Sequence, residues 1–137
     1  MSAENILIFL SAISFLIVVV IDLFNSRQFR RNKEKYEELL AEYRSHGFDI
    51  DIMTNYAIYF GTFANYQKII WFVRLYKGVR MKFTRERYVQ SEAYEFIQSL
   101  PDSRISWIMK LHRLYKIQAY IITFWLAITI VLLMLYK

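Results

Sequence analysis

Two long apolar stretches, one near each end of the chain, dominate its pattern of hydrophobic and polar positions. Residues 5–24 contain a single charge, Asp22, and residues 117–136 contain none. A helix of about 20 residues crosses the ~30 Å hydrocarbon core of a bilayer, and it pairs the backbone groups that lipid cannot solvate. We therefore predict transmembrane helices over residues 5–24 and 117–136. The alternative, two helices buried in a soluble protein, is disfavoured by two uncharged stretches in so short a chain.

Between these stretches, residues 25–116 mix charged and apolar positions. We expect the first span to continue as one helix to about residue 45, because that part lacks Gly and Pro and Gly47 suits the left-handed conformation that ends many helices. Residues 48–52 are expected to form a link, with a short strand as the alternative. The aromatic run 56–63 is too short to cross a bilayer, so we expect it to pack at the interface or against other helices.

The segment 68–83 has the most regular helical pattern of this middle region. Its apolar residues, among them Ile69, Phe72 and Val73, fall within an arc of about 120° on a helical wheel. We predict an amphipathic helix whose basic residues bind anionic headgroups of the cytoplasmic leaflet. In the alternative, the apolar arc packs in the protein and the charges are solvated. The candidate membrane-surface residues are Lys68, Arg74, Lys77, Arg80 and Lys82.

Two further helices complete the middle region. Thr84 is a candidate cap for a helix over residues 84–98, which Pro101 would close. Asp102 or Ser103 can cap a final helix that continues through Lys116 into the second span. The predicted fold is an all-α membrane protein, with two transmembrane helices at the chain ends and a helical, basic, aromatic-rich region between them.

Composition agrees with helices in lipid and excludes several other classes. The chain is 56% hydrophobic and 18% aromatic, with mean hydropathy +0.21, whereas disordered chains are polar and poor in aromatic residues. Only 3 Gly and 1 Pro leave too few turn residues for a sandwich or barrel of short strands. The absence of cysteine excludes disulfides, thiolate nucleophiles and Cys-ligated metals.

The distribution of positive charge predicts an orientation. All but one of the 18 Lys and Arg residues lie between Arg27 and Lys116, and basic residues favour the cytoplasmic side of a span. We therefore expect residues 25–116 in the cytoplasm and both termini outside. An isoelectric point near 9.5 also suits nucleic acid. No nucleic-acid module is visible, however, and the topology accounts for much of the charge, so we expect no nucleic-acid partner.

One acidic residue lies inside the first apolar stretch. If Asp22 were buried between helices, it would need a cation at the same depth, which Arg113 or Lys116 could supply. Its place near the cytoplasmic end of the span favours the alternative, in which the carboxylate reaches interfacial water.

Small residues recur at every fourth position of the second span. Side chains of this size let another helix approach closely, and a threonine hydroxyl can add an interhelical hydrogen bond. The neighbour would be the first span, a second copy of the chain or another membrane subunit. The candidate packing residues are Ala119, Thr123 and Ala127.

No group of residues in the chain matches a recognised enzyme motif. His46 and His112 belong to no metal-binding spacing, and three scattered glycines cannot form a phosphate-binding loop. Asp49 and Asp51 are interpreted as solvated or capping residues, because a complete EF-hand loop is absent. We therefore expect no enzymatic activity, no catalytic or metal site and no cofactor.

The middle region also has a characteristic order of segments. Residues 60–63 read Phe-Gly-Thr-Phe and residues 67–76 read Gln-Lys-Ile-Ile-Trp-Phe-Val-Arg-Leu-Tyr, ahead of a basic approach to the last span. This order resembles the universal stress protein B family of small bacterial inner-membrane proteins, although the chain is longer around residues 49–59 and 84–102 and lacks the family's run of glycines. The resemblance implies a bacterial inner membrane, a role in stress tolerance and no catalytic residues.

These patterns predict a non-enzymatic integral membrane protein that acts as a stress-related scaffold and recruits partners. The expected partners are a bilayer with an anionic cytoplasmic leaflet and either another membrane protein or a second copy of the chain. The alternative is an accessory subunit of a larger transporter or respiratory membrane complex, docked through the small residues of the second span.

Overall fold

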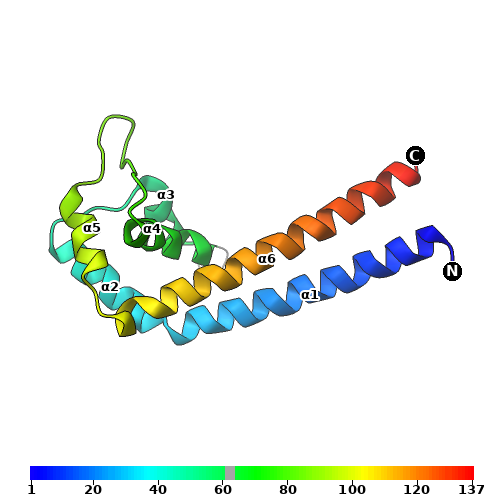
Figure 1. Ribbon diagram of the computed structural model, residues 1–137, viewed down its shortest axis with the longest axis horizontal. Helices are drawn as coiled ribbons and strands as arrows, with labels where there is room; N and C mark the ends of the chain where they lie inside the picture. The colour runs from blue at the N-terminus through cyan, green and yellow to red at the C-terminus, as the bar shows by residue number, and fades with distance from the viewer. Residues whose placement is uncertain (61–63) are drawn as a thin grey trace. The chain divides into compact units, whose positions relative to one another are not determined.

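The computed structural model describes residues 1–60 and 64–137 of the chain. Within these ranges it is helical, with one isolated antiparallel bridge between Lys82 and Tyr88. The chain divides into two compact units: the two-helix unit, Met1–Arg27 with Arg113–Lys137, and the middle unit, Gln28–His112. In chain order (Figure 1), the helices are α1 (Ala3–Arg31), α2 (Lys33–Ser45), α3 (Ile52–Ala57), α4 (Asn65–Lys77), α5 (Ser91–Gln98) and α6 (Asp102–Leu135).

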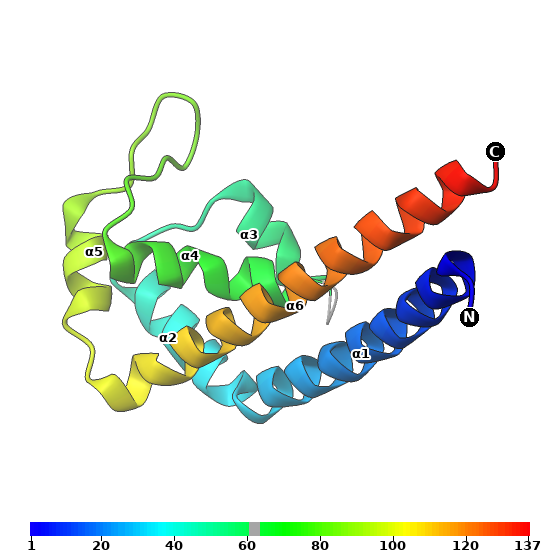
Figure 2. The same ribbon diagram turned by 45° about the vertical axis from the view of Figure 1, so that its right-hand side comes forward.

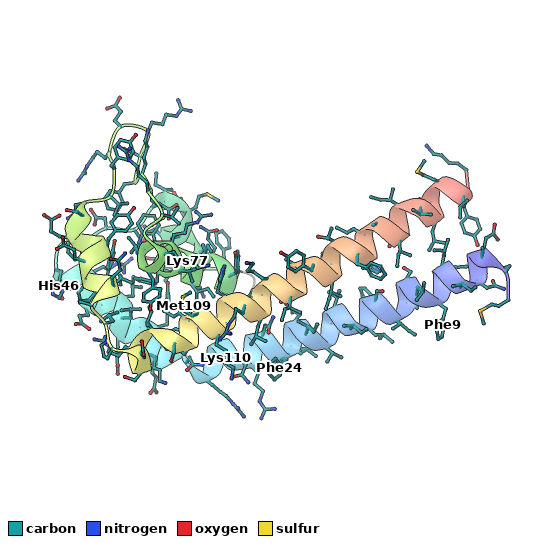
Figure 3. All side chains as sticks on the ribbon, in the orientation of Figure 1. Phe9, Phe24, His46, Lys77, Met109 and Lys110 are labelled. Atoms are coloured by element: carbon teal, nitrogen blue, oxygen red, sulfur yellow. The ribbon has the colours of Figure 1, made fainter. Side chains whose placement is uncertain are left out.

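In the two-helix unit, α1 and α6 lie side by side and run in opposite directions (Figures 1 and 2). Ser14 is buried at their contact, and the rings of Phe15 and Trp125 meet with centroids 5.5 Å apart. Phe9 and Phe24 are exposed and project from α1 on the side away from α6 (Figure 3). Most apolar side chains of this unit are likewise uncovered by protein, as expected for helices whose solvent is lipid.

The prediction of an all-helical chain with two long apolar helices near its ends is confirmed for the described residues. Both α1 and α6 are long and apolar enough to cross a membrane. Only 6% of the most apolar window of α1, and 11% of that of α6, is buried by the rest of the protein. A core helix of a soluble domain would be largely buried, so the observed exposure disfavours that alternative.

The predicted single helix reaching residue 45 is wrong at Asn32. α1 ends at Arg31 and α2 begins at Lys33, while Asn32 between them has φ −106° and ψ 10°. Its Nδ2 donates to the Gln28 carbonyl oxygen at 2.8 Å, and such a side chain competes with the helical backbone bond. The predicted end of the helix is confirmed, because Gly47 follows α2 with φ +80°.

The core of the middle unit contains α2, α4, α5 and the first turns of α6. Tyr43 is fully buried, and its ring meets that of Phe72 edge-on with centroids 5.5 Å apart. The Tyr43 hydroxyl donates to the Asp49 carbonyl oxygen at 2.9 Å and accepts from Trp71 Nε1 at 3.3 Å. Burial raises the pKa of Tyr43 to about 12. Other fully buried apolar side chains include Leu39, Ile69, Leu75, Ile97, Ile105, Ile108 and Leu111.

The amphipathic helix predicted over residues 68–83 ends earlier in the structure. α4 stops at Lys77, because Gly78 adopts a left-handed conformation with φ +73°. Glycine adopts this conformation without the steric penalty that a Cβ atom brings, and it commonly terminates helices. Val79 and Phe83 match the helical period of the segment but lie beyond the helix.

A hairpin replaces the first half of the helix predicted over residues 84–98. Phe83 N donates to the Arg87 carbonyl oxygen at 2.8 Å across the turn. Thr84 does not cap a helix; its hydroxyl oxygen accepts from Arg87 N at 3.3 Å within the same turn. The helix α5 begins only at Ser91. The aromatic and β-branched residues of this segment favour extended backbone, which the helical reading overlooked.

The link predicted over residues 48–52 has no regular structure over residues 48–51, but its last residue, Ile52, already belongs to α3. Asp51 caps α3, because its Oδ1 accepts from Thr54 N at 3.0 Å; the capping interpretation of this residue is confirmed. The last helix, α6, begins at Asp102, so Asp102 and Ser103 lie in its first turn and not at the cap position that was predicted for one of them. Part of the aromatic run 56–63 lies outside the described residues, and so does most of the Phe-Gly-Thr-Phe sequence at 60–63.

Candidate functional site

The apolar arc of α4 packs inside the middle unit. Ile69 and Phe72 are fully buried and Val73 is 1% exposed. Of the two interpretations of this arc, contact with lipid and contact with protein, the structure therefore supports the second. α4 is a core helix, and any lipid contact of the middle unit must come from other residues.

Lys68 belongs to this buried side of α4, so its prediction as a membrane-surface residue is wrong. Lys68 is only 8% exposed. The ammonium group donates to Asn65 Oδ1 at 3.4 Å and lies 5.3 Å from the centroid of the Phe29 ring. Burial lowers the pKa of Lys68, with a further contribution from the charge of Lys33. The helical wheel placed Lys68 on a flank of α4, but other residues of the middle unit, Phe29 among them, cover that flank.

The other four predicted basic residues are exposed, and they form what is here termed the basic surface. Two lie in the last turn of α4, where cations also complement the negative end of the helix dipole. The other two lie at the start of the hairpin, against one aromatic ring: the guanidinium carbon of Arg80 is 4.2 Å and Lys82 Nζ 4.6 Å from the Tyr88 centroid. The members of the basic surface are Arg74, Lys77, Arg80 and Lys82; Lys77 is labelled in Figure 3.

Side chains of α5 fix the base of the hairpin. The Tyr94 hydroxyl donates to the Val79 carbonyl oxygen at 2.7 Å and accepts from Met81 N at 2.9 Å. Gln98 Nε2 donates to the Leu75 carbonyl oxygen at 3.3 Å, near the end of α4. The cations at the start of the hairpin are thus carried on a supported backbone, because α5 holds both the end of α4 and the outgoing chain.

A second group of polar residues lies between α1 and α6 in the two-helix unit. Gln118 is 9% exposed; its Nε2 donates to Asp22 Oδ1 at 3.0 Å, and its Oε1 accepts from Asn25 Nδ2 at 2.8 Å. Asn25 is fully buried. These three side chains, here termed the polar cluster, join the helices through an amide that both donates and accepts.

Of the two interpretations of Asp22, the structure agrees with the favoured one, because the residue is exposed and not enclosed between the helices with a cation. Arg113 and Lys116 are exposed, and the ion pairs within the described ranges do not include either of them with Asp22. Gln118 occupies the partner position instead. Gln118 and Asn25 were not predicted as site residues, because each is a weak signal in the sequence: one amide side chain within the second span and one just beyond the end of the first.

The small residues of the second span face away from α1. Ala119, Thr123 and Ala127 are exposed, whereas Gln118 and Ile128 on the opposite side of α6 are buried. The Thr123 hydroxyl donates to the Ala119 carbonyl oxygen of its own helix at 2.9 Å. The first span is therefore excluded as the neighbour of this stripe, and a second copy or another subunit remains as a candidate.

The two histidines lie in structural settings. The His46 ring is 4.6 Å from that of Phe96, and His112, which is 7% exposed, stacks on Tyr66 at 5.9 Å. Among the residues that the structure describes, no group of three or more His, Cys, Asp or Glu side chains could hold a metal ion.

A comparison of this chain with protein-family models, with curated proteins and with solved structures finds no match.

Proposed function

We propose that the protein is a non-enzymatic membrane scaffold, anchored by α1 and α6, whose middle unit meets an anionic lipid surface through the basic surface and recruits or stabilises a partner. The observation that carries the proposal is that one chain combines two exposed apolar helices with exposed cations on a hairpin that α5 holds in place. Each well-placed cation near an anionic leaflet contributes about 1 kcal/mol.

The proposed location is a bacterial inner membrane, with residues 25–116 in the cytoplasm and both termini outside. It is supported by the concentration of Lys and Arg between Arg27 and Lys116 and by the resemblance to the universal stress protein B family, which also suggests a stress-related role. A phosphatase reporter fused after Lys137 is expected to be active outside the cytoplasm. A reporter that is active only in the cytoplasm at that position contradicts the topology.

The lipid contact can be tested with the full chain in nanodiscs. The chain has no cysteine, so Glu86→Cys supplies a single, exposed position in the hairpin turn for a fluorescent label. We expect phosphatidylglycerol to shield the label from acrylamide, a neutral quencher, and high salt to abolish the shielding. Pure phosphatidylcholine is expected to give little shielding.

Charge-reversal variants make this test specific. Arg80→Glu with Lys82→Glu is expected to remove the shielding, whereas the matched control, Lys33→Glu with Lys35→Glu, changes the net charge equally at exposed positions of α2 and is expected to retain it. Shielding that is equal in both lipids and in both variants contradicts the proposed leaflet contact.

A second candidate function is that of an accessory subunit in a larger transporter or respiratory complex. The observation that favours it is the exposed stripe of Ala119, Thr123 and Ala127, which the chain itself leaves uncovered. Native mass measurement after gentle detergent extraction separates the two functions. A stable assembly with different chains supports the subunit, whereas a monomer or homo-oligomer supports the scaffold.

A further inference from the structure

The middle unit carries an apolar surface that its own core does not use. Thr54 and Ala57, on the inner side of α3, are buried, but the outer side chains of α3 and of the turn after it are 61% to 82% exposed. They form what is here termed the α3 surface: Ile52, Met53, Tyr56, Tyr59 and Phe60. A contiguous exposed apolar surface of this kind marks a contact with a partner or a membrane.

We propose that the α3 surface lies in the headgroup layer of the bilayer that anchors the chain. The residue types fit this layer: no charged residue occurs between Asp51 and Lys68, so partial burial of the α3 surface in lipid requires no ionised side chain of this segment to lose its hydration. Tyr56 and Tyr59 combine an apolar ring with a polar hydroxyl, the combination that is enriched where hydrocarbon meets water.

Basic residues border the α3 surface and complement lipid phosphates. Arg44 Nη2 donates to Asn55 Oδ1 at 3.1 Å, which holds a guanidinium group against α3. A cavity of about 380 Å³ beside this contact is lined by Arg44, Asn55 and Arg87 together with Ile52 and the carboxylate-bearing Asp49. Ile52 belongs to both features, so the cavity and the apolar surface adjoin. Arginine is well suited to phosphate recognition.

The way the chain is connected favours lipid over another occupant. α1 passes from the two-helix unit into the middle unit between Arg27 and Gln28, and α6 passes from the middle unit back into the two-helix unit between His112 and Arg113. The middle unit is therefore tied at both ends to the helices proposed to cross the membrane, so under that proposal a bilayer is always within reach of its surface. This inference rests on the anchoring in the proposed function, but not on the basic surface.

Site-specific quenching in nanodiscs tests the inference with the full chain. Met53→Cys and Tyr56→Cys each supply one labelling position in a chain without cysteine, and Glu92→Cys at an exposed position of α5 is the control. We expect lipids that carry a quencher near the headgroup to quench the labels at 53 and 56 several-fold more than the label at 92. A matched thermal unfolding midpoint for the three variants checks that each is folded.

The outcomes separate lipid from the other occupants. Equal quenching at all three positions overturns the inference. Labels at 53 and 56 that are shielded from acrylamide but not quenched by lipid also overturn it, because a second copy or another protein then covers the surface. Quenching of the α3 labels is expected to persist in phosphatidylcholine at high salt, since the contact is apolar. The contact of the basic surface requires phosphatidylglycerol, so each proposal can fail without the other.

Discussion

The side chain of Gln118 in α6 donates to the Asp22 carboxylate in α1 at 3.0 Å. An amide, rather than a cation, thus partners the single acidic residue of the first apolar stretch. The same amide accepts from Asn25, so one side chain connects two residues that lie a helical turn apart on α1. In an environment poor in water, a polar residue that completes two hydrogen bonds specifies how the helices are aligned.

The first prediction concerns this connection. Gln118→Leu is expected to lower the free energy of unfolding by about 1–2 kcal/mol, because the buried Asn25 amide and the Asp22 carboxylate both lose their partner. Asp22→Asn is expected to be much milder, since an amide oxygen still accepts from Gln118. Reversible detergent unfolding of the full chain measures both effects.

The control for this experiment is Tyr120→Leu, a change of a polar ring that is 71% exposed on the same helix. It is expected to leave the unfolding free energy nearly unchanged. If Gln118→Leu is as stable as this control, the polar cluster does not hold α1 and α6 together.

The sequence predicts most of the helices because their signals are local. The uncharged stretches lie within α1 and α6, Gly47 follows α2 with a positive φ, and α6 begins at Asp102. The hairpin between α4 and α5 was missed because Val79 and Phe83 happen to continue the helical period past Gly78. The left-handed conformation of Gly78 ends the helix although the apolar spacing continues. The spacing of apolar residues does not reveal the backbone angles of a glycine between them.

The candidate site was only partly predictable, for a different reason. The exposed cations could be read from charge and spacing, but the burial of Lys68 depends on Phe29, which is distant in the sequence. The pairing of Asn25 with Gln118 joins residues 93 positions apart. Contacts of this kind depend on the tertiary fold, whereas a helical wheel describes one helix by itself.

A second prediction tests the end of α4. Gly78→Ala is expected to destabilise the protein by about 1–2 kcal/mol, because an L-residue with a Cβ atom is strained at a left-handed φ. The position has room for the extra carbon, whose nearest neighbour would be Gln98 Nε2 at 3.6 Å, so the cost is conformational. Gly78→Asn is the control, because asparagine tolerates this conformation better. Equal unfolding midpoints for Gly78→Ala and the wild type contradict this explanation.

A third prediction is a pH dependence that arises from Tyr43. Burial raises its pKa from 10.0 to about 12 in the folded protein, so the folded state favours the neutral phenol. The stability that the neutral phenol contributes is fully present below pH 10. It is lost as the pH rises towards 12, by about 2–3 kcal/mol in total. Tyr36, whose pKa burial also raises, adds to the decline.

The variant Tyr43→Phe isolates this contribution. At neutral pH it is expected to lose about 1–2 kcal/mol, because Trp71 Nε1 and the Asp49 carbonyl lose a buried partner. Between pH 10 and 12 its stability is expected to fall less steeply than that of the wild type. Parallel pH profiles for the two proteins, from unfolding titrations in the same detergent, contradict the assignment to Tyr43.

The last prediction concerns the stripe of small residues on the outer side of α6. Thr123→Leu is expected to weaken association with a second copy or another subunit by ~1 kcal/mol, about a fivefold change in the dissociation constant. The effect comes from added volume, because the Thr123 hydroxyl already donates to Ala119 of its own helix. Phe124→Leu changes an exposed residue that lies outside the stripe and is expected to leave association intact. Native masses of the wild type and both variants at equal concentration provide the measurement. If Thr123→Leu retains the wild-type assembly, close packing at the stripe is not what holds the assembly together, and the accessory-subunit function loses the surface through which it would dock.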